Sequence, residues 1–112
     1  MNEDAIRRAM AELRAEFMLE LPGRVERTVA AARRWLEHGE AADRALAAQL
    51  AHQLFGAAGT HDCPASADVA RRIELFFSKG DAEIEGDEQR TELGGFLREL
   101  EESVAVESAR AP

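Results

Sequence analysis

The sequence predicts an all-α fold, an antiparallel four-helix bundle with a short extra helix at its N-terminus. Two observations lead to this prediction. Apolar residues recur at helical spacing through most of the 112 residues, and only three prolines interrupt a chain rich in alanine. No stretch shows the strict alternation of apolar and polar residues that is typical of a half-buried strand.

One apolar stripe runs through the first third of the chain. It consists of Ile6, Met10, Leu13, Phe17, Leu21, Val25, Val29, Ala32 and Leu36. The first helix is expected to begin after Asn2, a suitable N-cap, and to end near Glu20. Because Pro22 and Gly23 break or bend a helix, the rest of the stripe belongs either to a second helix or to the same helix beyond a kink. Gly39 is placed to end this region.

Two side chains close to Gly39 have simple structural interpretations. Trp35 lies at the edge of the apolar stripe, and we expect a partly buried core residue there rather than a docking residue. His38 is interpreted as a positive charge at the C-terminal end of a helix.

The central helix is expected from about Ala41 to Ala58, with Leu46, Leu50 and Leu54 facing inward. The following helix takes Asp62 or Ser66 as its N-cap and has Pro64 in its first turn. It ends at residues 79–80. Its buried stripe is Val69, Ile73, Phe76 and Phe77.

Residues 81–88 contain five acidic side chains and precede the last helix. We interpret them as a solvated connection in which Asp81 or Asp87 caps that helix. The ligand spacing of an EF-hand is missing, so calcium is not expected. Gly94 and Gly95 are expected to allow close approach to a neighbouring helix. The last helix should bury Leu93, Phe96, Leu97, Leu100 and Val104.

The length fits one domain, and we expect a single domain over residues 1–112 with a polar tail from about residue 107. The predicted core consists of Leu13, Phe17, Val29, Leu46, Leu50, Leu54, Val69, Ile73, Phe76, Leu93, Phe96, Leu97 and Leu100.

The charge of the chain limits its partners. A net charge of −8 argues against nucleic acid, which requires a basic surface. Residues 1–60 hold eight basic and nine acidic groups, whereas residues 61–112 hold six and thirteen, so the first half is nearly neutral. No segment is apolar enough to span a membrane, no signal-peptide pattern occurs, and Cys63 is the only cysteine. We therefore expect a cytoplasmic protein.

His52 is the most informative residue of the central helix. At about 100° per residue, it projects almost opposite the inward leucines and therefore faces water. The face that it shares carries only small residues, Ala45, Ala48, Gly56 and Gly59. Two glycines inside a helix cost about 1 kcal/mol each relative to alanine, which suggests that a large partner comes close to His52.

This pattern resembles the histidine-containing phosphotransfer (Hpt) domain, whose signature reads His-x-Leu-Lys-Gly. His52, Leu54 and Gly56 match it, and Phe55 replaces the lysine. Further matches over residues 13–77 are Phe17, Leu21, Pro22, Gly59, Thr60, Pro64, Ala70, Ile73 and Glu74. The resemblance implies the same helical bundle, with His52 exposed midway along a helix as the phospho-accepting nucleophile.

The resemblance also implies a function and partners. A neutral imidazole has a lone pair at pH 7 without help from a base. The chain would relay a phosphoryl group between receiver-domain aspartates in a two-component phosphorelay, as a monomer that docks on a response-regulator receiver domain or a hybrid histidine kinase. Mg²⁺ would belong to the receiver, and this chain would bind no cofactor. No nucleotide-binding motif is present, so autonomous kinase activity is not expected.

Phe55 is expected about 60° around the helix from His52 and at least partly exposed. It provides either a docking contact for the receiver or an edge residue of the core, and the sequence leaves both interpretations open.

Two alternative functions remain. A non-transferring Hpt-like module could dock on a histidine kinase or response regulator and regulate it. A metal-dependent enzyme could use His38, His52, His61, Asp62 and Cys63, although their spacing is not that of a zinc motif.

Overall fold

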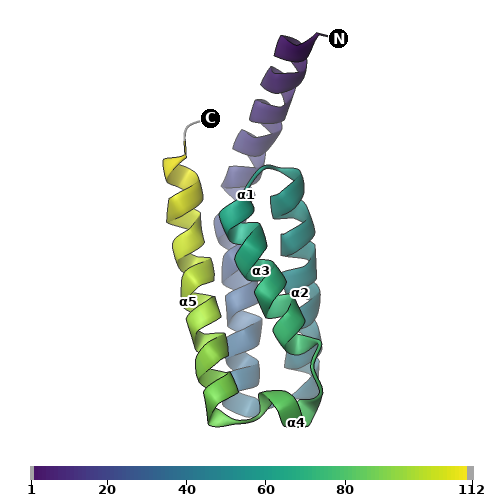
Figure 1. Cartoon of the computed structure of the whole chain (residues 1–112), viewed down its shortest axis with the longest axis vertical. Coiled ribbons are helices and arrows are strands. Elements are labelled where there is room, and N and C mark those ends of the chain that lie inside the picture. Colours follow the sequence, from purple (N-terminus) through teal and green to yellow (C-terminus); the bar gives the residue numbers. More distant parts are fainter. Residues whose placement is uncertain (1, 111–112) are drawn as a thin grey trace.

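Four long helices and one single-turn helix make up the part of the chain that the computed structural model describes, residues 2–110. They are α1 (Glu3–His38), α2 (Ala41–Thr60), α3 (Pro64–Phe77), α4 (Asp81–Ile84) and α5 (Asp87–Ala109). The long helices lie side by side, and α4 closes the end opposite the two termini (Figure 1). No strand occurs within residues 2–110, so the prediction of an all-α fold is confirmed.

The N-terminal region differs from the prediction because no separate short helix forms there. α1 runs without interruption through Pro22, and its first turns project beyond the rest of the bundle (Figure 1). Leu21 and Val25 are both buried, whereas Pro22 is exposed. Burial of two such side chains stabilises by about 1.5 to 3 kcal/mol each, which offsets the helix hydrogen bond that a proline removes.

The two ends of α1 are capped as the sequence indicates. The Asn2 side chain accepts a hydrogen bond from the Ala5 amide at 2.8 Å. Gly39 has a φ of 67°, a left-handed conformation that favours glycine, and its amide donates to the Trp35 carbonyl at 2.7 Å. These caps account for both helix boundaries.

The projecting part of α1 overturns one core prediction. Leu13 is 51% exposed, and Ile6 and Met10 of the same stripe are also exposed. The helical phase is right, since Phe17 in the next turn is buried. Within residues 2–110, the other helices do not cover the first turns of α1, so the apolar stripe there is exposed.

The buried face of α2 is rotated from the predicted one. Ala47, Ala51, Leu54 and Ala58 are buried, whereas Leu46 is 39% exposed and Leu50 is only partly buried. Leu46 is therefore not a core residue. α2 packs against both α1 and α3, and small alanines at the centre of these contacts allow the helices to approach closely. Leu46 and Leu50 lie at the edges of the contact, whereas Leu54 stays in the core.

Most of the other predicted core residues are buried. These are Phe17, Val29, Leu54, Val69, Ile73, Phe76, Leu93, Leu97 and Leu100, while Phe96 is partly buried. Trp35 is also buried, which confirms its core interpretation. Its ring lies edge-on to Phe76 and Phe77, with centroids 6.1 and 5.4 Å away.

The connection before α5 contains a helical turn that the sequence did not predict. α4 buries Ile84 against the core, and Asp81 at its start forms an ion pair with Arg44 of α2. Gly86, rather than an aspartate, is the N-cap of α5. At the start of α3 the N-cap is Cys63, without a side-chain hydrogen bond, so neither Asp62 nor Ser66 has that role.

The glycine pair of α5 does not mark a close helix contact. A Cβ atom added at Gly94 or Gly95 would meet only the Arg98 side chain, at 3.9 Å in each case. The prediction of close approach to a neighbouring helix is therefore wrong. The structure shows no packing reason for the absence of a side chain at these two positions.

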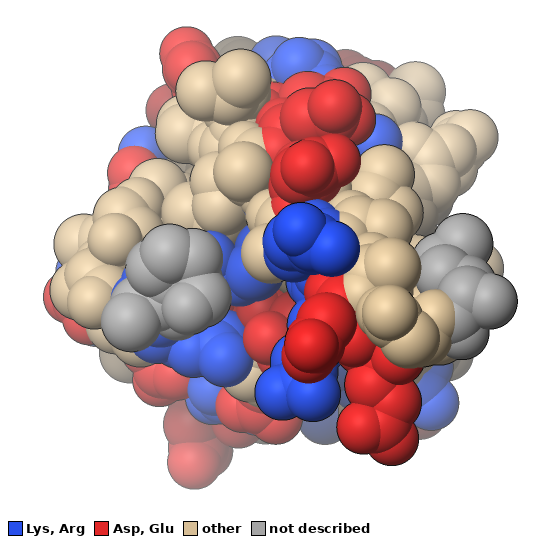
Figure 2. Space-filling view, turned by 90° about the horizontal axis from the view of Figure 1, so that it is seen from above, with Lys and Arg blue, Asp and Glu red and all other residues tan. Residues whose placement is uncertain are grey.

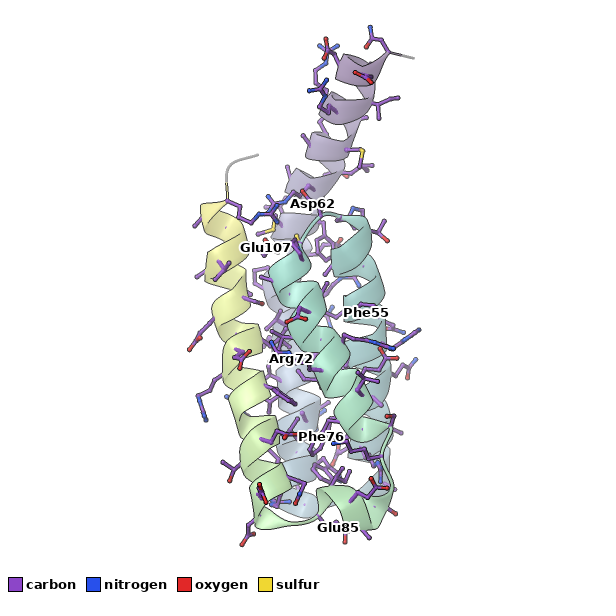
Figure 3. The ribbon with its side chains drawn as sticks, viewed as in Figure 1. Phe55, Asp62, Arg72, Phe76, Glu85 and Glu107 are labelled. Carbon is purple, nitrogen blue, oxygen red and sulfur yellow. The ribbon has the colours of Figure 1, made fainter. Side chains whose placement is uncertain are left out.

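A buried carboxylate holds the end of the bundle at which the termini lie. Glu107 is fully buried, accepts hydrogen bonds from the Ala65 amide at 3.2 Å and from Arg110 at 2.8 Å, and lies 3.6 Å from Arg14. It lies close to Asp62 at this end (Figure 3). Because these contacts tie α5 to α1 and α3, α5 continues to Ala109 instead of giving way to a polar tail at residue 107.

Seen from this end, basic and acidic side chains are interleaved rather than separated by sign (Figure 2). Within residues 2–110, none of the helices combines the length and apolar character that crossing a bilayer requires.

Candidate functional site

His52 lies midway along α2 with its side chain 70% exposed. Its neighbours Ala51 and Leu54 are buried, and this orientation of α2 turns His52 toward solvent, as predicted. The burial pattern therefore presents the imidazole on the outer surface of the bundle.

The face of α2 that carries His52 otherwise holds small, uncharged residues. Ala45, Gly56 and Gly59 are exposed, while Ala48 is partly buried against the core. A Cβ atom added at Gly56 or Gly59 would meet nothing within 4 Å, so packing within the chain does not require glycine at either position. The open space lies on the same helix face as His52.

Glu74 of α3 reaches across to His52. Its Oε1 lies 2.9 Å from His52 Nδ1, and its side chain is 20% exposed. Because a carboxylate oxygen accepts, the N–H group at Nδ1 donates this hydrogen bond, and the lone pair of the imidazole lies on Nε2. This contact selects one tautomer and one orientation of the ring.

Arg71 and Phe55 complete a cluster with His52 and Glu74. Glu74 Oε2 is buried without a hydrogen-bond partner within residues 2–110, and Arg71 Nη1 lies 3.4 Å from it as an ion pair. The Arg71 guanidinium also lies over the Phe55 ring, 5.2 Å from its centroid. Phe55 is partly buried against the core, so its predicted partial exposure is confirmed. The four side chains join one face of α2 to α3.

The sequence alone did not identify Glu74 or Arg71 as parts of this site. In the sequence, Glu74 is only a match to the family pattern, and no motif distinguishes Arg71 from the other arginines. Helical periodicity shows which face a residue occupies but not which residue of another helix lies opposite. The one available signal was the missing lysine at Phe55, which raises the question of where the positive charge has gone.

The other histidines and the cysteine do not join His52. His38 lies at the end of α1 beside Glu37, and His61 stacks on Phe17 with ring centroids 4.8 Å apart. Burial raises the pKa of the Cys63 thiol, which makes it a poor ligand or nucleophile. Within residues 2–110, no group of three or more His, Cys, Asp or Glu side chains could hold a metal ion.

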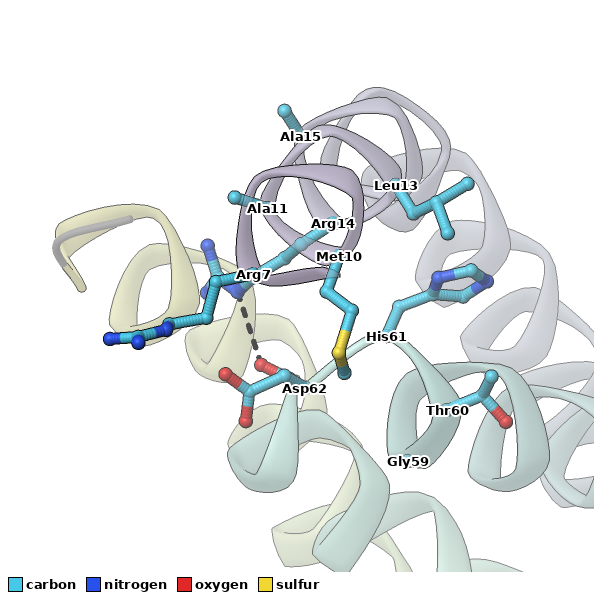
Figure 4. Close-up of a pocket in the computed structure, with 10 residues that line it drawn as sticks. All are labelled: Arg7, Met10, Ala11, Leu13, Arg14, Ala15, Gly59, Thr60, His61 and Asp62. Carbon is cyan, nitrogen blue, oxygen red and sulfur yellow. Dashed lines mark hydrogen bonds between the residues drawn. The ribbon is translucent and has the colours of Figure 1, made fainter. Parts of the chain in front are cut away.

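A separate pocket of about 720 Å³ lies beside the projecting part of α1, next to the connection between α2 and α3 (Figure 4). Arg14 crosses this end and donates a hydrogen bond to the Asp62 carbonyl at 3.1 Å. The pocket is lined by Arg7, Met10, Ala11, Leu13, Arg14, Ala15, Gly59, Thr60, His61 and Asp62.

The protein-family model described as "Hpt domain" matches residues 12–107. The chain belongs to the Hpt domain family. The match includes His52, Glu74 and all of α2, α3 and α4, and it confirms the resemblance found in the sequence. Neither the comparison with curated proteins nor the comparison with solved structures gives a match.

Membership brings a general role. Hpt domains are phosphotransfer intermediates of two-component phosphorelays, interact with receiver domains and histidine kinases, and are not autonomous kinases. The helical bundle of this Hpt domain is consistent with that family.

Proposed function

We propose that this Hpt domain relays a phosphoryl group between receiver-domain aspartates, with His52 as the phospho-accepting nucleophile. The observation that carries the proposal is the contact between His52 Nδ1 and Glu74 on an exposed helix face. It leaves Nε2 as the nitrogen with a lone pair, and Nε2 is therefore the proposed site of phosphorylation.

In the transfer step, this chain supplies the attacking nitrogen and the carboxylate that stabilises the charged ring. The Nε2 lone pair attacks the phosphorus of the receiver's aspartyl phosphate, an N–P bond forms, and the P–O bond breaks as the aspartate carboxylate leaves with its electron pair. The imidazole ring becomes positively charged and keeps its proton on Nδ1. Glu74, which accepts the hydrogen bond from Nδ1, stabilises that charge. The reverse step passes the phosphoryl group to another aspartate, and the receiver contributes Mg²⁺.

We propose that the receiver docks on the face of α2 around His52, which is formed by Ala45, Ala48, Phe55, Gly56 and Gly59. The open space at Gly56 and Gly59 and the lack of charged side chains at these five positions support this assignment. An incoming phosphoryl group is negative, so an uncharged surface avoids repulsion.

The alternative is a docking module that binds a kinase or receiver without accepting phosphate. The replacement of the signature lysine by Phe55 favours this alternative, while the oriented His52 favours transfer. The same protein cannot fit both descriptions, so a labelling experiment decides between them.

The experiment incubates the purified protein with a phosphorylated receiver and Mg²⁺. We expect transfer to His52 that gives an acid-labile, base-stable adduct. His52→Gln should abolish labelling while the helical circular dichroism stays unchanged. Labelling that survives this substitution, or a folded wild-type protein that no receiver of the same genome labels, contradicts the proposal.

A further inference from the structure

The phosphorylated form of this site has a charge that its own helix does not neutralise. A phosphoryl group on His52 would bring negative oxygens to a face of α2 that carries alanine, glycine and Phe55, and the signature lysine is missing. The cation of the His52 cluster is Arg71, which comes from α3.

Arg71 is held in a way that leaves its donors available. Its guanidinium lies over the Phe55 ring and 3.4 Å from Glu74 Oε2, yet it makes no hydrogen bond within residues 2–110, and its side chain is 47% exposed. A guanidinium stacked on an aromatic face keeps its N–H groups at the edge, where they can bind phosphate oxygens.

The next residue on the same helix provides a contrast. Arg72 donates hydrogen bonds to Asp68 at 3.0 Å and to Glu99 at 2.8 Å, and its guanidinium lies over Phe96 of α5. It belongs to the contact between α3 and α5 and is committed to other partners. The two neighbouring arginines therefore have different surroundings.

We propose that Arg71 binds the phosphoryl group of phosphorylated His52, replacing from α3 the positive charge that the family signature places on α2, and that Phe55 is the platform for its guanidinium. This inference rests on the proposed function and assigns two residues to the same site. Phe55 is then neither only a docking contact nor only an edge of the core.

Charge balance gives a reason for Arg71 to change partners. Before transfer, the imidazole is neutral and Arg71 is the cation that faces Glu74. After transfer, the imidazole ring is positive and takes over as the charge partner of Glu74 through Nδ1. The guanidinium is then free to rotate from the carboxylate toward the phosphoryl oxygens, where it forms charge-assisted hydrogen bonds.

The test uses chemically phosphorylated protein, so that no receiver is needed. Phosphoramidate labels histidine, and the decay of phosphorylated His52 is followed by ³¹P nuclear magnetic resonance. Arg71→Gln should shorten its lifetime about two- to fivefold, the range expected for a half-exposed ion pair. Arg72→Gln removes the same charge one residue away and should leave the lifetime unchanged. Phe55→Leu, which keeps an apolar side chain but removes the platform, should also shorten it.

Two double variants separate phosphoryl binding from a structural role. In a Glu74→Gln background, Arg71→Gln should still shorten the lifetime, because the guanidinium acts on the phosphoryl group itself. Phe55→Lys should restore the lifetime of Arg71→Gln. An effect of Arg71→Gln that disappears in the Glu74→Gln background would mean that Arg71 acts only through Glu74, and it would overturn the inference.

Different results would contradict the role of Arg71 and the proposed relay function. Equal lifetimes for Arg71→Gln and Arg72→Gln overturn the role of Arg71, whether or not receivers transfer to His52. A lifetime that depends on Arg71, in a protein that no receiver labels, supports the phosphoryl site and contradicts the relay. Melting temperatures of all variants show whether a lifetime change reflects unfolding.

Discussion

Replacing Glu107 by Gln should weaken the end of the bundle where α1, α3 and α5 meet. The two carboxylate oxygens accept from the Ala65 amide and from Arg110, and Arg14 lies 3.6 Å away. A glutamine has nearly the same volume but only one acceptor oxygen, so its NH₂ group must face one of these donors. The perturbation therefore removes charge and one acceptor without creating a cavity.

The magnitude follows from the exposure of the partners. Glu107 is fully buried, but the Arg110 side chain is 38% exposed and can recover a hydrogen bond to water. We therefore expect a loss near the range for hydrogen bonds to charged groups, about 1 to 3 kcal/mol in the free energy of unfolding. For a domain of this size, that corresponds to a decrease of about 4 to 12 °C in melting temperature.

The assay is thermal and urea denaturation followed by circular dichroism. Glu102→Gln is the matched control, because Glu102 is exposed on the same helix and loses the same charge. Its melting temperature should stay close to that of the wild type. Equal melting temperatures for the two variants would refute the reasoning, since the buried contacts of Glu107 would then contribute nothing measurable.

Further predictions concern both the site and the core. Gly56→Glu should block transfer from a receiver but not labelling by phosphoramidate, because it obstructs docking only; loss of both reactions would contradict this. Leu54→Ala should cost about 2 to 5 kcal/mol and Leu46→Ala clearly less, as measured by urea denaturation. Gly95→Ala should raise stability by about 0.5 to 1 kcal/mol, and a lower melting temperature would show an unrecognised constraint. Cys63 should react with iodoacetamide only when the protein unfolds; rapid alkylation of the native protein would contradict its burial.

The sequence predicted which segments are helical better than it predicted which residues of different helices pack together. Periodicity placed the stripe that contains Phe17 correctly, but it could not show that Leu13 lies beyond the ends of the other helices. It also favoured Leu46 over Ala47, because a large apolar residue is a stronger burial signal than alanine. In the structure, close packing of the helices buries Ala47 and leaves Leu46 exposed.

The candidate site shows the same limit. His52 and its surface of small residues could be predicted because they lie on one helix, where spacing fixes their relative directions. Glu74 and Arg71 come from another helix, and their distance from His52 depends on how α2 and α3 pack. Pro22 shows the converse, since a local helix-breaking signal was overridden by burial on either side of it.

The alanines on the buried face of α2 also determine how precisely the imidazole is aimed. Ala47, Ala51 and Ala58 have no exposed surface, so a larger side chain at any of them would have to displace the helix. If such a shift lengthened the 2.9 Å contact between His52 and Glu74 by about 1 Å, the two atoms would be beyond hydrogen-bond range. A variant such as Ala51→Val should therefore weaken the contact that selects the tautomer of His52, even where the bundle stays folded.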